Sequence, residues 1–211
     1  MKNFILLFIV AALVATLFAG PSHALDGDRL KVILSRLEQR AEKIETLRCR
    51  FEQTTYSAMF EEEQEGKGEM LFQRPERLRW ELLHPFRRGF AVDGAAAVRW
   101  RGEKGASQTF RLAEAPGLQA LSEQLLAWLR GDYAWLEAHY AIELENEQPI
   151  RLKLTPAGDD GPVRNLTIVF TSDETHLERL ELRQWDGDEM RLAFSAVEIN
   201  GPMEAALFQQ R

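Results

Sequence analysis

One cation, Arg74, follows four uncharged residues on the same face of a predicted strand. Alternate residues of a strand point to one face, so Gly66, Gly68, Met70, Phe72 and Arg74 lie together. A charge on an apolar face needs partners, and a guanidinium offers five hydrogen-bond donors. We therefore interpret Arg74 as a group that binds several backbone carbonyls of a covering segment and releases them when that segment moves. The alternative is a structural ion pair with a strand carboxylate.

Catalytic chemistry finds little support in the sequence. Cys49 is the only cysteine, so it forms no intrachain disulfide, and its spacing between Leu47 and Phe51 is typical of a buried strand residue. Three of the histidines, His84, His139 and His176, form no HExxH or CxxC pattern. We predict no metal, no cofactor and no enzymatic activity. A serine, histidine and acid that meet only in space remain an open alternative.

The next strand repeats the two-faced pattern and predicts an apolar concavity. Leu78, Trp80 and Leu82 face one way, and Arg77 and Glu81 face the other. With the neighbouring strands, the residues expected to line this concavity are Phe51, Met70, Phe72, Leu78, Trp80, Leu82, Phe90, Val92, Val98 and Trp100. Each of them alone is as well explained as ordinary core.

A helical stripe is a candidate cover for the concavity. Five apolar residues recur at helical spacing: Leu118, Leu121, Leu125, Trp128 and Leu129. The segment stops at Gly131, a typical helix cap, and Asp132 begins a short helix to His139. The stripe packs on the sheet either as a fixed core helix or as a lid that opens.

The remaining patterns predict one sheet. A helix is expected over residues 30–47, and about eleven alternating segments predict strands of a single antiparallel sheet in the α+β class. The expected strands are residues 48–56, 64–73, 77–83, 89–92, 95–101, 108–112, 140–145, 150–155, 165–171, 177–184 and 189–199. Asp93 and Gly94 predict a tight hairpin turn. A sheet of this size curls into an unclosed half-barrel, with helices over its hollow.

The first residues predict export. Residues 1–24 combine a basic start, an apolar run and a small-x-small site ending at Ala24, which is typical of a cleaved signal peptide. An uncleaved anchor is the alternative, although the run is shorter than the roughly 18 residues of a spanning helix. No cysteine lies at the site for lipid attachment. Residues 25–211 then form one domain.

The charge of the chain excludes one class of partner and leaves another open. The formal charge is −7, which argues against nucleic-acid binding. Residues 74–101 nevertheless hold seven arginines against three acids, a local charge of +4. Such a face suits an acidic partner or a lipid phosphate, or else it pairs with glutamates across strands.

The combined spacing resembles the LolA family of periplasmic lipoprotein carriers. The residues that carry the resemblance are Phe51-Glu52-Gln53, Gly68, Met70, Arg74-Pro75, Trp80, Pro85, Asp93-Gly94 and Trp100. A weaker match continues through residues 129–133 to Leu207-Phe208. The resemblance implies a half-barrel that holds acyl chains under helices, with Arg74 in the position that keeps the lid closed.

The resemblance also implies partners and a place of action. The chain would act in the periplasm as a monomer, taking acyl chains of lipoproteins from an inner-membrane release complex and passing them to an outer-membrane acceptor. Family members usually continue beyond the last aromatic position, whereas this sequence ends at residues 208–211. A paralogue that carries another envelope lipid or glycolipid is therefore an alternative, followed by an enzyme or a structural envelope module on the same scaffold.

Overall fold

The computed structural model describes residues 22–102, 107–158 and 161–209. Contacts divide the chain into two units, residues 1–33 and 34–211. The strands all belong to the second unit. Residues 1–21, which hold most of the expected signal peptide, lie outside the described residues, so the export signal stays a prediction.

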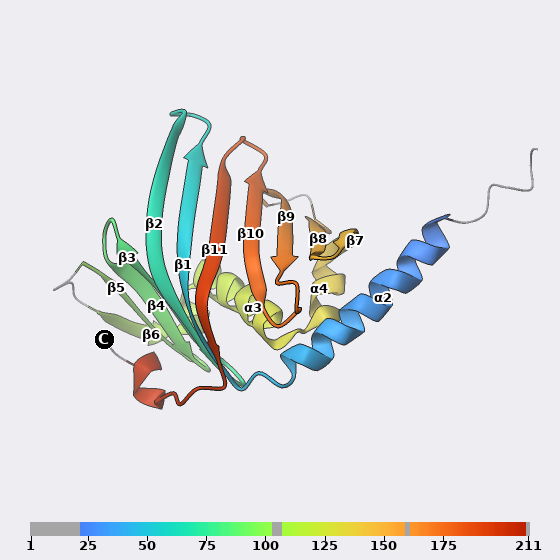
Figure 1. Cartoon of the computed structure of the whole chain (residues 1–211). Coiled ribbons are helices and arrows are strands. Elements are labelled where there is room, and N and C mark those ends of the chain that lie inside the picture. The colour runs from blue at the N-terminus through green and yellow to red at the C-terminus, as the bar shows by residue number, and fades with distance from the viewer. Residues whose placement is uncertain (1–21, 103–106, 159–160, 210–211) are drawn as a thin grey trace, which may run out of the picture. The chain divides into compact units, whose positions relative to one another are not determined.

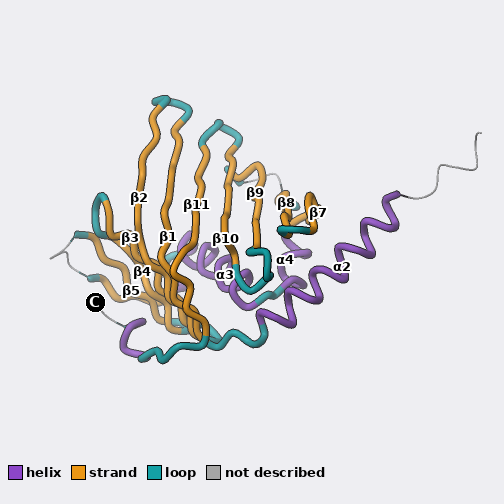
Figure 2. Tube along the Cα trace, in the orientation of Figure 1, coloured by secondary structure: helices purple, strands orange, loops and turns teal. Residues whose placement is uncertain are grey.

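The strands form one antiparallel sheet of eleven strands (Figures 1 and 2). Their order is β6-β5-β4-β3-β2-β1-β11-β10-β9-β8-β7. The bounds are β1 Thr46–Ser57, β2 Glu62–Gln73, β3 Arg77–His84, β4 Arg88–Asp93, β5 Ala96–Arg101, β6 Gln108–Arg111, β7 Tyr140–Glu147, β8 Ile150–Pro156, β9 Val163–Phe170, β10 Leu177–Gln184 and β11 Glu189–Ile199. The chain runs outward from β1 to β6, crosses to β7, and returns until β11 pairs with β1. Strands β6 and β7 stay at opposite edges, which confirms the unclosed sheet.

Two of the described helices connect the two halves of this sheet. The described helices are α2 (Ser22–Ala41), α3 (Pro116–Arg130) and α4 (Tyr133–His139), with short 3-10 turns η1 (Leu112–Glu114) and η2 (Ala205–Phe208). Helices α3 and α4 carry the chain from β6 to β7 on one side of the sheet (Figure 1). The cap between them is confirmed, because Gly131 has a φ of 69° and the Asp132 side chain accepts a hydrogen bond from the Trp135 N–H at 3.0 Å.

The first helix ends earlier than the sequence predicts. The apolar spacing extends to Leu47, but α2 ends at Ala41 and β1 begins at Thr46. Asn200 explains the break: its side chain donates to the Lys43 carbonyl at 2.8 Å and accepts from the Glu45 N–H at 2.8 Å. These distant partners replace helical hydrogen bonds, and the sequence alone does not reveal them.

The side of the sheet that carries Met70 and Trp80 is its helix face. These two residues lie directly opposite each other in β2 and β3. The space left by Gly68 is occupied, because a Cβ there would overlap the Phe51 ring. Phe51 in turn stacks on Trp80, with ring centroids 4.3 Å apart. The glycine therefore permits an aromatic layer on the helix face.

The other side, the outer face, holds two residues that the sequence places in the concavity. Val98 lies opposite Ala91, and Trp100 lies opposite Gly89. Cross-strand partners share a face, and Gly89 in turn pairs with Glu81, whereas Trp80 pairs with Phe90. The side chains of Val98 and Trp100 are therefore corrected to the outer face, although Trp100 also borders a hollow that Trp80 and Phe90 line. The tight turn between Asp93 and Ala96 pairs even-numbered residues of β4 with odd-numbered residues of β5, which sequence alternation alone does not show.

Candidate functional site

Arg74 lies just after β2 and binds three backbone carbonyls. Its Nε donates to the Ile44 oxygen at 2.9 Å, and its Nη2 donates to the Ala41 and Arg130 oxygens at 2.7 and 3.3 Å. Ala41 ends α2 and Arg130 ends α3. Carbonyls at helix C-termini lack intrahelical partners and carry partial negative charge. One half-buried guanidinium thus links the C-terminal ends of α2 and α3 to the end of β2.

Arg74 has no carboxylate partner among the described residues. The backbone N–H of Arg74 also donates a hydrogen bond to the Glu45 carbonyl at 2.9 Å. Other arginines of the same segment do bind acids: Arg77 contacts Asp93 at 2.8 Å, for example. Replacing a hydrogen bond to a neutral carbonyl by one to water costs less free energy than breaking a buried ion pair.

A small apolar pocket lies beneath the helix ends. It measures about 60 Å³ and is lined by residues from α2, α3 and the helix face of the sheet, including Leu37, Cys49, Met70, Trp128 and Leu129. An engineered cavity of about 150 Å³ holds one benzene. This apolar pocket therefore cannot hold an acyl chain unless the helices move.

A larger hollow lies further along the helix face. It measures about 590 Å³, within the range of ligand sites. Trp80, Leu82 and Phe90 form its apolar floor, and Leu118 of α3 also lines it. Of the other predicted lining residues on this face, Phe51, Phe72, Leu78 and Val92 are packed into the core with exposed fractions of at most 1%.

The predicted stripe of α3 is divided between these two spaces. Leu118 lines the larger hollow, whereas Trp128 and Leu129 line the apolar pocket. Leu125 is half-buried and Leu121 is 44% exposed. The buried residues of α3 are instead Ser122, Leu126 and Ala127. The predicted stripe is therefore the side of the helix that borders open space.

The indole of Trp128 adds an unusual feature to α3. Its Nε1 atom is buried and has no hydrogen-bond partner among the described residues. A buried unsatisfied donor costs roughly 1–3 kcal/mol. The packing of α3 against the sheet in this arrangement is thus less favourable than that of a fully satisfied core helix.

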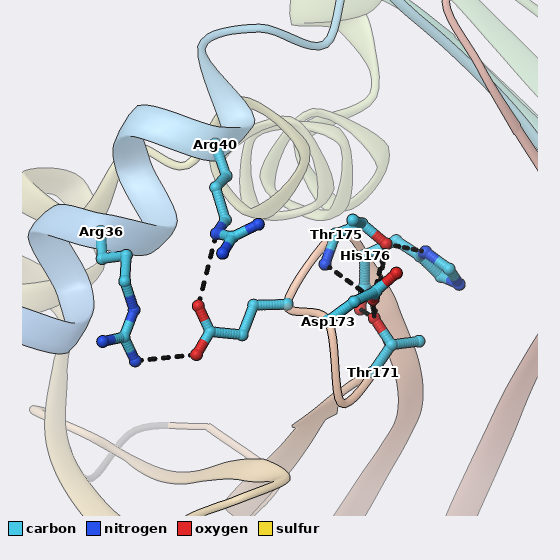
Figure 3. Close-up of polar contacts among 7 residues, drawn as sticks. Arg36, Arg40, Thr171, Asp173, Thr175 and His176 are labelled. Carbon is cyan, nitrogen blue, oxygen red and sulfur yellow. Dashed lines mark hydrogen bonds and ion pairs between the residues drawn. The ribbon is translucent and has the colours of Figure 1, made fainter.

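Sequence reasoning missed a second attachment of α2 (Figure 3). Glu174, in the turn between β9 and β10, contacts Arg36 at 2.8 Å and Arg40 at 3.3 Å. The spacing of these two arginines places them on one helix side, but nothing in the sequence indicates their partner 134 residues or more away. Both lie in the residue 34–211 unit.

The turn that presents Glu174 is braced by Asp173. Its carboxylate accepts hydrogen bonds from the hydroxyls of Thr171 and Thr175, at 2.6 and 2.9 Å, and from the Thr175 N–H (Figure 3). These bonds lower the pKa of Asp173 to about 2. Glu174 itself has a positive φ of 59°, which turns its side chain toward α2.

An ion-paired cluster lies on the outer face, whereas the described residues that line the larger hollow include no acid. Glu81 accepts hydrogen bonds from Arg79 at 2.8 Å, Arg87 at 2.7 Å and the Trp100 indole at 3.1 Å. Burial raises the pKa of Glu81, but the two arginine hydrogen bonds outweigh burial and the net pKa lies below the ordinary value. Phe208 of η2 is fully buried, and Arg79 donates to the Leu207 carbonyl, so the C-terminal turn packs at this cluster. The arrangement is structural.

Among the described residues, no group of histidine, cysteine and acidic side chains has the geometry of a metal site. Within the same residues, no helix combines the length and the apolar composition needed to cross a bilayer.

An open antiparallel half-barrel, with a cation-held pair of helices over an apolar hollow, defines the class of this protein. The chain belongs to the LolA family, described as outer membrane lipoprotein carrier protein LolA, whose family model matches residues 42–211.

The named relatives have low sequence identity to this chain, but the matches cover most of both proteins. The outer-membrane lipoprotein carrier protein of Chromohalobacter salexigens is 25% identical over 165 residues, which cover 74% of this chain and 75% of that protein. The protein of the same description from Dechloromonas aromatica is 28% identical over 167 residues, or 78% and 76% of the two chains.

Solved structures share the fold at lower identity. An uncharacterized conserved protein from Thermus thermophilus matches with a TM-score of 0.51 and 10% identity, over 87% of this chain and 94% of that one. MucB matches with a TM-score of 0.51 and 15% identity, over 91% and 65%. These likenesses concern the fold alone.

Proposed function

We propose that this protein is a periplasmic carrier that shields acyl chains on the helix face of its sheet. The observation that carries the proposal is the set of three hydrogen bonds by which Arg74 holds the ends of α2 and α3 above apolar space. Family membership and the names of the relatives support the same role. We call these hydrogen bonds the Arg74 latch.

The energies of latch and cargo are of comparable size. Each hydrogen bond to a charged group contributes roughly 1.5–3 kcal/mol, so three contribute about 5–9 kcal/mol at most. Burial of an acyl chain yields roughly 0.8 kcal/mol per methylene, or about 11 kcal/mol for fourteen methylenes. A long chain therefore has enough binding energy to displace the latch, and a short one does not.

The second attachment of α2 is the weaker one. The Arg36 and Arg40 side chains are 44% and 43% exposed, and the Glu174 side chain is 14% exposed. Solvent at the two arginines screens these ion pairs, so we assign them about 1 kcal/mol. Opening is therefore limited by Arg74. The unsatisfied Trp128 indole favours movement of α3, because an open lid returns that donor to water or to a polar ligand group.

In this proposal residues 25–211 are the mature, exported domain. Cargo enters from an inner-membrane donor complex, displaces the lid, and leaves toward an outer-membrane acceptor that binds it more tightly. Lipoprotein acyl chains are the leading cargo because the family and its relatives are described as lipoprotein carriers. Another envelope lipid remains the alternative cargo.

An enzymatic role has less support. The described residues that line the larger hollow include no acid and no histidine, so general acid–base catalysis has no candidate there. A structural module without a ligand is disfavoured by a hollow of about 590 Å³ with an aromatic floor.

Native mass spectrometry of the mature protein after mild purification tests the proposal. We expect a population with bound lipid, which is lost on extraction with organic solvent. A single mass without lipid, together with no uptake of an added acyl probe, would exclude the carrier role.

A further inference from the structure

The larger hollow combines an apolar floor with three arginines on the same face. Register places Leu82 opposite Arg88, and Arg88 opposite Arg101. It also places Phe90 opposite Arg99. Cross-strand partners share a face, so these guanidinium groups belong to the helix face and line the hollow with Trp80, Leu82 and Phe90.

None of these arginines forms an ion pair with a carboxylate of the described residues. Arg88 and Arg101 are exposed, lie directly opposite each other, and form no ion pair with any described carboxylate. Like charges in this position repel. The Arg99 guanidinium donates to the neutral Gln108 side-chain oxygen at 3.0 and 2.6 Å, which holds it in place without neutralising it.

On the outer face, by contrast, the arginines are paired with acids. There Arg77 pairs with Asp93, while Arg79 and Arg87 share Glu81. The local excess of positive charge in residues 74–101 is therefore concentrated on the helix face, beside the apolar floor. An ordinary paired sheet surface does not explain this distribution.

We propose that the larger hollow binds an amphiphile with an anionic head group. Its acyl chain packs on Trp80, Leu82 and Phe90, and its phosphate or carboxylate oxygens accept hydrogen bonds from Arg88, Arg99 and Arg101. Guanidinium groups bind such oxyanions through paired donors. The inference rests on the proposed carrier function and specifies its cargo class as lipids with a charged head.

The test compares two probes that differ only in the head group. Lauroyl lysophosphatidic acid and monolauroylglycerol, each below its micelle concentration, are titrated into the mature protein while tryptophan fluorescence is followed. Glycerol 3-phosphate is a third probe without an acyl chain. We expect the phosphate lipid to bind at least tenfold more tightly than the neutral lipid at low salt, and this preference to shrink as salt is added.

Substitution of the arginines tests whether they cause the preference for the phosphate lipid. R88Q/R101Q is expected to reduce the preference for the phosphate lipid at least fivefold while it leaves the affinity for monolauroylglycerol unchanged. Arg111→Gln is the matched control, because Arg111 is exposed and pairs with Ala96 on the outer face. It should retain the full preference.

The outcomes separate this inference from the carrier role. Equal affinity of the wild type for both lipids overturns the head-group assignment and leaves the carrier role intact. Glycerol 3-phosphate that binds as tightly as the phosphate lipid indicates a site for free phosphate and overturns the assignment to lipid. If neither lipid binds, both proposals fail.

Discussion

Arg74 is distinguished from neighbouring arginines by what it binds. Acids hold Arg77, Arg79 and Arg87 in place, whereas Arg74 contacts backbone oxygens at the ends of two helices. Water can replace those oxygens when the helices move. This difference in partner makes Arg74 suited to a reversible contact and the others to fixed ones.

Replacement of Arg74 by leucine should stabilise the lipid-bound form. Leucine cannot re-form the carbonyl hydrogen bonds that favour the closed, empty state, so we expect release of a bound acyl probe to acceptor vesicles to slow at least tenfold. The empty protein should lose about 2–4 kcal/mol of unfolding free energy. Release rates measured by stopped-flow fluorescence check this, with Arg50→Leu, an exposed site on β1, as the control. Unchanged release kinetics would rule out the Arg74 latch.

Trp80 is the residue whose change should abolish uptake. It stacks on Phe51 and forms part of the floor of the larger hollow. A glutamate there places an unpaired charge on apolar surface, so Trp80→Glu should bind a fluorescent fatty acyl probe at least a hundredfold more weakly. Trp185→Glu, at a side chain that is 65% exposed, should bind normally. Retained uptake by Trp80→Glu would place the acyl site elsewhere.

Among the elements, α2 has two attachments, and we expect them to differ in strength. The carbonyl of Ala41 is bound by Arg74, while the Arg36 and Arg40 side chains reach Glu174 in the β9–β10 turn. Cys49 lies beneath them, lines the apolar pocket and is 2% exposed. Burial raises its pKa to about 12. In the proposed mechanism we therefore expect the thiol to react only when the helices open.

Loss of Glu174 should open α2 slightly. Because its ion pairs are partly exposed, Glu174→Gln should cost less than about 1 kcal/mol and speed the alkylation of Cys49 by no more than about fivefold. Arg74→Leu should speed the same reaction of the empty protein more than tenfold. Alkylation measured by intact mass over time at pH 8 distinguishes the two variants. A larger effect from Glu174→Gln would make the turn, rather than Arg74, the main restraint.

At the scale of the whole sheet, the buried Glu81 cluster links stability to pH. The folded pKa of Glu81 lies below its ordinary value of 4.5, so the unfolded state binds its proton first as pH falls. The stabilisation is complete above pH 4.5 and is lost as pH falls through the folded pKa.

Glu81→Gln should therefore flatten the dependence of unfolding free energy on pH below about pH 5. At pH 7 the variant should also be less stable by about 3 kcal/mol, since it removes the charge that Arg79 and Arg87 share. Urea unfolding at a series of pH values measures both effects. Glu76→Gln, at an exposed position, is the control and should keep the wild-type slope. If unfolding free energy depends on pH as steeply in Glu81→Gln as in the wild type, Glu81 is not the source of that pH dependence.

Much of the architecture could be predicted from local patterns. Alternation located the eleven strands, and Gly131 and Asp132 marked the break between α3 and α4. These features depend on neighbouring residues only: strand periodicity, a left-handed glycine and a capping carboxylate. The end of α2 was missed because Asn200, far along the chain, supplies the hydrogen bonds that replace helical ones.

The order of neighbouring residues is enough to predict which residues alternate, where the strands turn and that Arg74 follows an apolar strand face, because these features are local. Three-dimensional packing sets the rest: the Val98 and Trp100 side chains belong to the outer face, Glu174 contacts Arg36, and Arg88 and Arg101 lie opposite each other with no ion pair to a described acid. Strand register and long-range pairing decide those contacts. A shift of one residue moves a side chain to the other face of the sheet, and the local pattern is the same in either case.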